Sequence, residues 1–151
     1  MLGLSWVSRR GDKALRIAAE DAVAKIGTVL PEALRPFFYD APLLAPPKYG
    51  LIEDRIDVSH VRRAIRGQHK LDIAYQDERS EATRRVIWPL AISYFDSQRI
   101  VVAWCELRQG FRHFRTDRIS EMQQLEHKYR EPRLKLLSRW KAERANEGTG
   151  G

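Results

Sequence analysis

Arginine is the residue type whose spacing in this chain points most clearly to chemistry. The aromatic segment Phe111–Thr116 carries Arg112 and Arg115, and Arg118 follows it closely. A guanidinium group is always charged, and its planar set of N–H donors pairs with phosphate or carboxylate oxygens. Because side chains alternate along a strand, Arg112 and Phe114 are expected on one face, with Arg115 on the other. The spacing predicts contact with an anion, and a surface ladder in which the arginines pair with Asp117 or Glu106 is the alternative.

Aromatic residues in the same half of the chain could complete such a site. A ring beside arginines can stack on a base while the guanidinium groups hold phosphate. Trp104 lies in the most apolar segment, 100–107, and is interpreted as a core residue. The other candidates for stacking are Tyr75, Tyr94 and Trp88.

Catalytic patterns are missing from the sequence. The four histidines show no metal-ligand spacing, and there is no His-Glu-x-x-His or Cys-x-x-Cys motif. There is also no glycine-rich phosphate loop, nucleophile elbow or spaced carboxylate pair. The single cysteine, Cys105, lies in an apolar run and is interpreted as a small buried hydrophobe. The sequence therefore predicts a binding protein, with no enzymatic activity, metal or cofactor.

Composition narrows the partner class. The chain has 151 residues, 43% of them hydrophobic and 31% charged, and a formal net charge of +7. These values are typical of one compact domain with appendages, and the positive balance favours nucleic acid or a phosphorylated ligand. No apolar run approaches the roughly 18 residues of a membrane span. The expected location is the cytoplasm.

Hydrophobic periodicity predicts three segments along the chain. Residues 1–57 are expected to form a helical connector, with a helix from Asp12 to Pro31, followed by a proline-rich linker. Residues 58–127 open with a short helix that ends at Gly67 and continue as short strands. Residues 128–151 hold a last helix, with Leu134, Leu137 and Trp140 on its apolar side, and a glycine-rich tail.

The strand candidates favour an α+β fold built on a small antiparallel barrel of the SH3 or Sm type. Closure into a barrel would remove exposed sheet edges. The segments are 71–75, 83–88, 90–95, 100–107 and 111–116, with a final one at 119–125.

The same region resembles the WYL domain, a sensory module of bacterial transcription regulators. The matching residues are Leu71–Tyr75, Arg85 ahead of Trp88-Pro89, Ala103-Trp104-Cys105, and the signature Arg112-x-Phe114-Arg115-x-Asp117-Arg118-Ile119. The Trp-Tyr-Leu tripeptide that names the family would fall at Arg99-Ile100-Val101 and is absent.

The resemblance implies a function and a set of site residues. In such domains the matching positions border a basic pocket thought to take nucleotides or short single-stranded nucleic acid. The implied ligand-binding residues are Tyr75, Arg85, Arg99, Arg112, Phe114, Arg115 and Arg118. The segment 2–31 resembles the connector that follows a helix-turn-helix in one branch of these regulators. That DNA-binding part is expected to be separate or missing here.

These observations predict the effector-sensing domain of a transcription regulator, which we expect to form a homodimer through its uncovered apolar helix faces. Two alternatives remain open. One is a stand-alone binder of single-stranded DNA or RNA, and the other is a scaffold whose arginines pair only internally.

Overall fold

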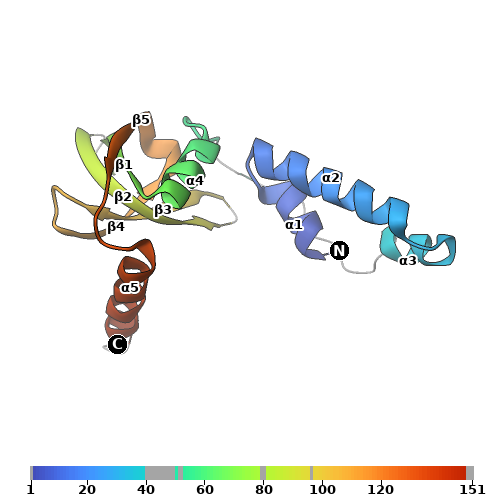
Figure 1. Cartoon of the computed structure of the whole chain (residues 1–151). Coiled ribbons are helices and arrows are strands. Elements are labelled where there is room, and N and C mark those ends of the chain that lie inside the picture. The colour runs from blue at the N-terminus through green and yellow to red at the C-terminus, as the bar shows by residue number, and fades with distance from the viewer. Residues whose placement is uncertain (1, 40–49, 51–52, 79–80, 96, 149–151) are drawn as a thin grey trace. The chain divides into compact units, whose positions relative to one another are not determined.

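The computed structural model describes residues 2–39, 50, 53–78, 81–95 and 97–148. These residues belong to two compact units, Met1–Leu51 and Ile52–Gly151 (Figure 1). No helix in the described part of the chain combines the length and the apolar character that a membrane span requires. The predicted proline-rich linker, residues 40–47, lies outside the described residues.

The first unit is helical. Its elements are α1 (Leu2–Arg10), α2 (Lys13–Val29), the 3-10 turn η1 (Glu32–Leu34) and α3 (Arg35–Tyr39). Asp12 caps α2 by accepting hydrogen bonds from the N–H groups of Ala14 and Leu15, as expected for an N-cap aspartate. The predicted helix before Pro31 is therefore confirmed.

The second unit contains five antiparallel strands. They are β1 (His69–Gln76), β2 (Ala82–Tyr94), β3 (Arg99–Cys105), β4 (Gly110–Arg115) and β5 (Ile119–Lys128). Their order in the sheet is β4-β3-β2-β1-β5, and the 3-10 turn η2 (Thr116–Arg118) joins the two edge strands. Every strand pairs with its neighbour in an antiparallel register.

Two predicted strands, 83–88 and 90–95, are one strand in the structure. Pro89 does not end β2, because the pairing with β3 shifts register between Pro89 and Ala91. A proline, which lacks an N–H donor, is tolerated at such a bulge. The long strand β2 therefore runs through both predicted segments, and the final candidate segment supplies the fifth strand.

Helix α4 (Val58–Gly67) covers one face of the sheet, which we call the inner face (Figure 1). Asp57 caps its first turn, and its apolar side packs on the strands. The left-handed residue after the helix is Gln68, with φ of 56°, so Gly67 is the last helical residue. The buried cluster beneath α4 consists of Val61, Ala64, Ile65, Leu71, Ile73, Ile87, Val101, Ala103, Cys105, Phe114 and Ile119.

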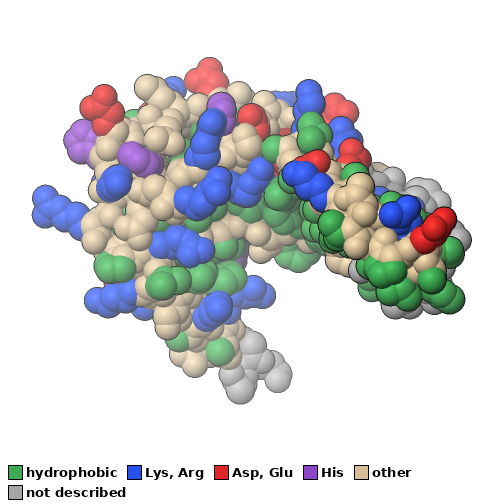
Figure 2. Space-filling model, turned by 45° about the vertical axis from the view of Figure 1, so that its right-hand side comes forward, with side chains coloured by type: hydrophobic (Ala, Val, Ile, Leu, Met, Phe, Trp, Pro, Cys, Tyr) green, Lys and Arg blue, Asp and Glu red, His purple; other side chains and the backbone are tan. Residues whose placement is uncertain are grey.

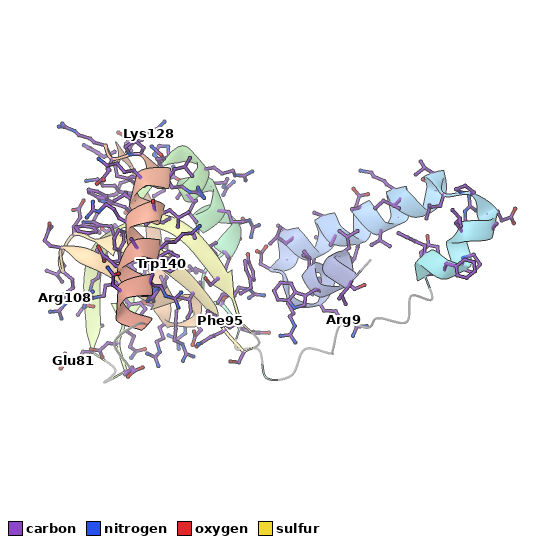
Figure 3. The ribbon with its side chains drawn as sticks, turned by 90° about the horizontal axis from the view of Figure 1, so that it is seen from below. Arg9, Glu81, Phe95, Arg108, Lys128 and Trp140 are labelled. Carbon is purple, nitrogen blue, oxygen red and sulfur yellow. The ribbon has the colours of Figure 1, made fainter. Side chains whose placement is uncertain are left out.

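Helix α5 (Arg133–Gly148) packs against the opposite, outer face. Figure 3 labels Trp140 midway along this helix. Leu136 is buried with Leu90, Phe111 and Tyr129, whereas the predicted Leu134 is 72% exposed. Leu137 and Trp140 pack against this cluster as predicted, so Leu134 is the one residue of the predicted apolar side that Leu136 replaces.

The α+β class and the antiparallel five-stranded sheet agree with the prediction, but the strand pairing does not close the sheet. Among the described residues, β4 pairs only with β3, and β5 pairs only with β1. The turn η2 links the two edges without a ladder between them. Closure into an SH3- or Sm-type barrel is therefore not seen in the hydrogen bonding.

Candidate functional site

Two of the predicted arginines lie on the inner face of the sheet. Directly paired residues of antiparallel strands project to the same side. Arg85 pairs with Ile73, and Arg112 pairs with Ala103. Both partners belong to the core beneath α4. The inner face is therefore apolar where α4 covers it and carries two guanidinium groups elsewhere.

The guanidinium groups of Arg85 and Arg112 approach one pair of facing residues. Arg85 Nη1 lies 4.0 Å from the Sγ atom of Cys105. Arg112 Nη1 lies 3.6 Å from the position that a Cβ atom would take at Gly110. Cys105 and Gly110 are direct partners in the β3–β4 register. The register thus places two cations that are 27 residues apart in sequence beside the same cross-strand pair.

Neither of these two arginines is neutralised. Arg85 Nε donates to Thr83 Oγ1 at 3.1 Å, and Arg112 Nη1 donates to the Phe111 carbonyl at 2.7 Å. Within the described part of the chain, neither guanidinium group forms an ion pair with a carboxylate. Each keeps N–H donors for an external oxyanion.

Tyr75 and Phe114 have different places beside these arginines. Their rings meet edge to face, with centroids 5.1 Å apart. Phe114 is 3% exposed and belongs to the core, whereas Tyr75 is only partly buried. Phe114 therefore supports the ring of Tyr75, and Tyr75 is the aromatic side chain available at the edge of the site.

Arg115 and Arg118 lie at the end of the site near η2, and both meet carboxylates. Arg115 donates to both oxygens of Asp117, at 3.1 and 3.0 Å. These hydrogen bonds raise the pKa of Arg115 above its ordinary value. Arg118 lies 3.5 Å from Glu78, whose side chain is 87% exposed. The predicted internal pairing with Asp117 is thus observed for Arg115, and the ion pair of Arg118 is the more exposed one.

Arg99 has a structural role, as one half of a buried ion pair. It is 4% exposed, and its guanidinium group donates to Asp54 Oδ2. Thr116 Oγ1 donates to the other oxygen of Asp54. A buried guanidinium group needs such a partner, because an unpaired charge is costly inside a protein. The structure does not bring Arg99 to the Arg85–Arg112 pair.

The tryptophans that were considered for stacking lie on the outer face. Trp88 and Trp104 pair directly and pack in the cluster beneath α5. Trp88 stacks on Tyr129 with an interplanar angle of 4° and donates from Nε1 to Glu106 at 2.7 Å. Lys70 Nζ also donates to Glu106, at 2.6 Å. These contacts separate both tryptophans from the inner-face arginines.

Glu106 itself has a shifted pKa. Burial raises the pKa of the Glu106 carboxyl, but the hydrogen bonds from Lys70 and Trp88 outweigh burial, so the pKa ends below its usual value. The carboxylate is therefore ionised at neutral pH and holds Lys70 against the outer face.

Two residues with clear roles were not singled out from the sequence. Thr83 lies between Arg85 and the Tyr75 carbonyl, to which its hydroxyl donates at 3.3 Å. Asp54 joins Arg99 to Thr116. Thr83 could have been found from its alternation with Arg85, but nothing in the sequence marks Asp54 as the partner of a residue 45 positions away.

The remaining chemistry of the described residues is limited. They hold no group of three or more His, Cys, Asp or Glu side chains that could bind a metal ion. In the view of Figure 2, many Lys and Arg side chains are spread over the face that carries the sheet unit, and most of its Asp and Glu side chains lie near the upper margin. The second unit thus combines a small sheet, which has α4 on its inner face and α5 on its outer face, with two arginines on the inner face.

Comparison with models of known protein families identifies the family of the second unit. Residues 57–124 match the family model of the WYL domain. This part of the chain, from the N-cap of α4 into β5, is a WYL domain, and the resemblance drawn from the sequence is confirmed.

The proteasome accessory factor B/C (PafBC) of Arthrobacter aurescens is similar to this chain at 30% sequence identity, with a TM-score of 0.43. The match covers 46% of this chain and 11% of that chain. The comparison with curated proteins gave no match.

Proposed function

We propose that this WYL domain is the effector-sensing part of a transcription regulator and that it binds an anionic effector, a nucleotide or a short single-stranded nucleic acid. The observation that carries the proposal is the pair Arg85 and Arg112. They share the inner face and have no carboxylate partner among the described residues. Two guanidinium groups in this arrangement suit the oxygens of one phosphate group or of two neighbouring ones.

Neighbouring side chains support a nucleotide as the effector. Tyr75 offers a partly exposed ring on which a base can stack. Arg118, which holds a mostly exposed glutamate, can exchange that carboxylate for phosphate at little cost. In this proposal Arg115 and Phe114 hold the shape of the site, and Arg99 holds its far end.

A route for the signal follows from the contacts of η2. Arg118 and Asp117 belong to this turn, and its first residue, Thr116, donates to Asp54. An effector that binds Arg118 more tightly in one position of η2 than in another would favour one position of Asp54. In the sequence, Asp54 lies close to the start of the second unit, which follows the helical unit at Ile52. We propose that this differential binding is how the domain passes its state to the rest of the regulator.

A binding survey tests the proposed function. Mononucleotides, cyclic nucleotides and single-stranded oligonucleotides of increasing length would be titrated into the chain at several salt concentrations. A sensor should select one small nucleotide or one short length, with a shallow dependence on salt. Affinity that rises steadily with length and falls steeply with salt would instead favour the stand-alone nucleic-acid binder. Absence of binding to every anion would contradict both.

A further inference from the structure

A cleft lies between α4 and the strands β1 and β5. Its volume is about 440 Å³, within the range of small-molecule sites. Its lining combines three nitrogen-bearing side chains, one amide and two apolar side chains: His60, Arg63, His69, Gln124, Leu71 and Met122. No carboxylate is among the lining residues. The predicted site residues of the inner face do not line it either.

The cation of this cleft is Arg63. It lies on the exposed side of α4 and forms no ion pair within the described ranges of the chain. The carboxylate of Asp57, in the first turn of α4, accepts hydrogen bonds from Ser59 and lies 3.5 Å from His60 Nε2. These hydrogen bonds lower the pKa of Asp57, and the charge of Arg63 also lowers it. The side chains of Arg63 and Asp57 form no hydrogen bond or ion pair with each other, so the N–H donors of Arg63 are open to a ligand.

The position of His69 is fixed by two features of the fold. Its Nδ1 atom lies 3.2 Å from the Leu125 carbonyl, which only accepts hydrogen bonds, so Nδ1 carries a proton in this contact. Its ring also lies against Gly67, where an added Cβ atom would come within 2.6 Å of His69 Cδ2. The Nε2 atom is consequently held at the cleft and remains available to a ligand.

The strand wall of the cleft is irregular at this point. The pairing of β1 with β5 shifts register between His69 and Leu71, whose partners are Lys128 and Gln124. Three residues of β5 thus stand opposite Lys70, and one of them, Leu125, turns its carbonyl to His69. Bulges of this kind often occur beside binding sites, because they redirect side chains.

We propose that this cleft binds a small organic oxyanion with an apolar body. Arg63 holds the charged head, Nε2 of His69 and the amide of Gln124 bond to polar groups of the ligand, and the partly buried Met122, which packs on the core, contacts the apolar body. A carboxylate and a phosphate monoester share this chemistry. The site is independent of the proposed effector site, since it uses neither Arg85 nor Arg112.

The test uses the full chain labelled with ¹⁵N and two probes, phenyl phosphate and benzoate, with benzyl alcohol as the uncharged control. Binding of at least one anion should shift the amide signals of Gly67, His69, Met122 and Gln124 and should saturate, with a dissociation constant on the order of 1 mM for so small a probe. The anion that binds more tightly identifies the head group. Absence of saturation with both anions, or equal shifts with benzyl alcohol, would overturn the proposal.

Matched variants locate the binding. Arg63→Gln should weaken it about tenfold, as expected for loss of a charge-assisted hydrogen bond. Arg66→Gln, which removes the same charge one turn further along α4, should leave it unchanged. Arg85→Gln should also leave it unchanged, which separates this site from the effector site. Unaltered affinity in Arg63→Gln, or loss in Arg85→Gln, would contradict the assignment.

Discussion

At the scale of single residues, the arginines predicted for the site fall into two groups that differ in their hydrogen-bond partners. Arg99 and Arg115 are paired with Asp54 and Asp117, so their charges are used inside the fold. Arg85 and Arg112 have only neutral acceptors among the described residues. The arginines predicted for the site therefore include both carboxylate-paired and unpaired ones, and the partner of each guanidinium group distinguishes them.

Asp54→Asn tests the structural group. The change leaves the buried guanidinium group of Arg99 without a carboxylate, so the free energy of unfolding should fall by about 3 kcal/mol or more. Chemical denaturation measures this loss. The matched control is Asp72→Asn, which breaks the solvent-exposed ion pair with Arg84 and should therefore cost far less stability. Equal losses in the two variants would contradict the role given to Asp54.

Thr83→Val tests the positioning of Arg85. Valine keeps the shape of threonine but removes the oxygen that accepts from Arg85 Nε. Because the guanidinium group then loses one of its fixed contacts, affinity for the effector should fall about threefold to tenfold, while the unfolding free energy changes by about 1 kcal/mol. Isothermal titration and denaturation measure the two quantities separately. A loss of stability with unchanged affinity would show Thr83 to be structural only.

The alternation of residues predicted part of this division. It placed Arg112 on the face of Phe114, and the register confirms that both point to the inner face. It also allowed Arg115 to pair with Asp117, which is the observed contact. Alternation could not predict the burial of Arg99, because its partner Asp54 lies before α4 in the chain and only the tertiary fold brings the two residues together.

At the scale of elements, β2 organises the WYL domain. The first half of its 13 residues pairs with β1 and the second half pairs with β3. A bulge after Pro89 interrupts the pairing with β3. From the sequence alone, Pro89 predicts the end of a strand, since a proline usually interrupts the hydrogen-bond ladder of a sheet. The buried neighbour Leu90 and the pairing on both sides of the bulge keep the strand continuous.

Tyr129 ties this strand to the C-terminal helix and provides a test by pH. Its hydroxyl donates to the Pro89 carbonyl at 3.0 Å, and burial raises its pKa to about 12. Because folding raises the pKa of Tyr129, its neutral hydroxyl stabilises the folded protein at pH values below 10.0, the pKa of an unperturbed tyrosine. This contribution to the free energy of unfolding is lost as the pH rises from 10.0 toward 12.

The expected result compares Tyr129→Phe with the wild type. At pH 8 the variant should be less stable by about 1 kcal/mol, because the Pro89 carbonyl loses its donor. Between pH 10 and pH 12 this difference should disappear or reverse. Denaturation at a series of pH values measures it. A difference that stays constant over this range would contradict the contact.

At the scale of the whole molecule, the two units differ in how well they cover their apolar residues. The helical unit exposes most of the large apolar side chains that are exposed in the described residues. Examples are Ile17 at 54%, Val29 at 80% and Phe37 at 78%. Large apolar side chains left exposed in such number often mark a contact with a partner. We therefore propose that a second copy of the chain covers these side chains, as a homodimer.

Sedimentation velocity tests the dimer. The mean mass of the wild type should rise with concentration, and the double change Val29→Glu with Phe37→Glu should leave a monomer, because both charges would fall in the interface. Leu107→Glu is the control, since Leu107 is also exposed but lies in the turn between β3 and β4. A wild type that stays monomeric at every concentration would contradict the proposal.

The most direct test of the account compares two adjacent arginines of β2. Arg85 points to the inner face, whereas Arg84 pairs with Ala74 across the sheet and is held outside by Asp72 and Glu121. Arg84→Gln and Arg85→Gln therefore change the net charge equally on opposite faces. Isothermal titration with the tightest anion from the nucleotide survey should show at least a tenfold loss of affinity in Arg85→Gln. The loss in Arg84→Gln should be less than about threefold. Equal losses in both variants would mean that the anion senses only overall charge, and the inner face would not be the effector site.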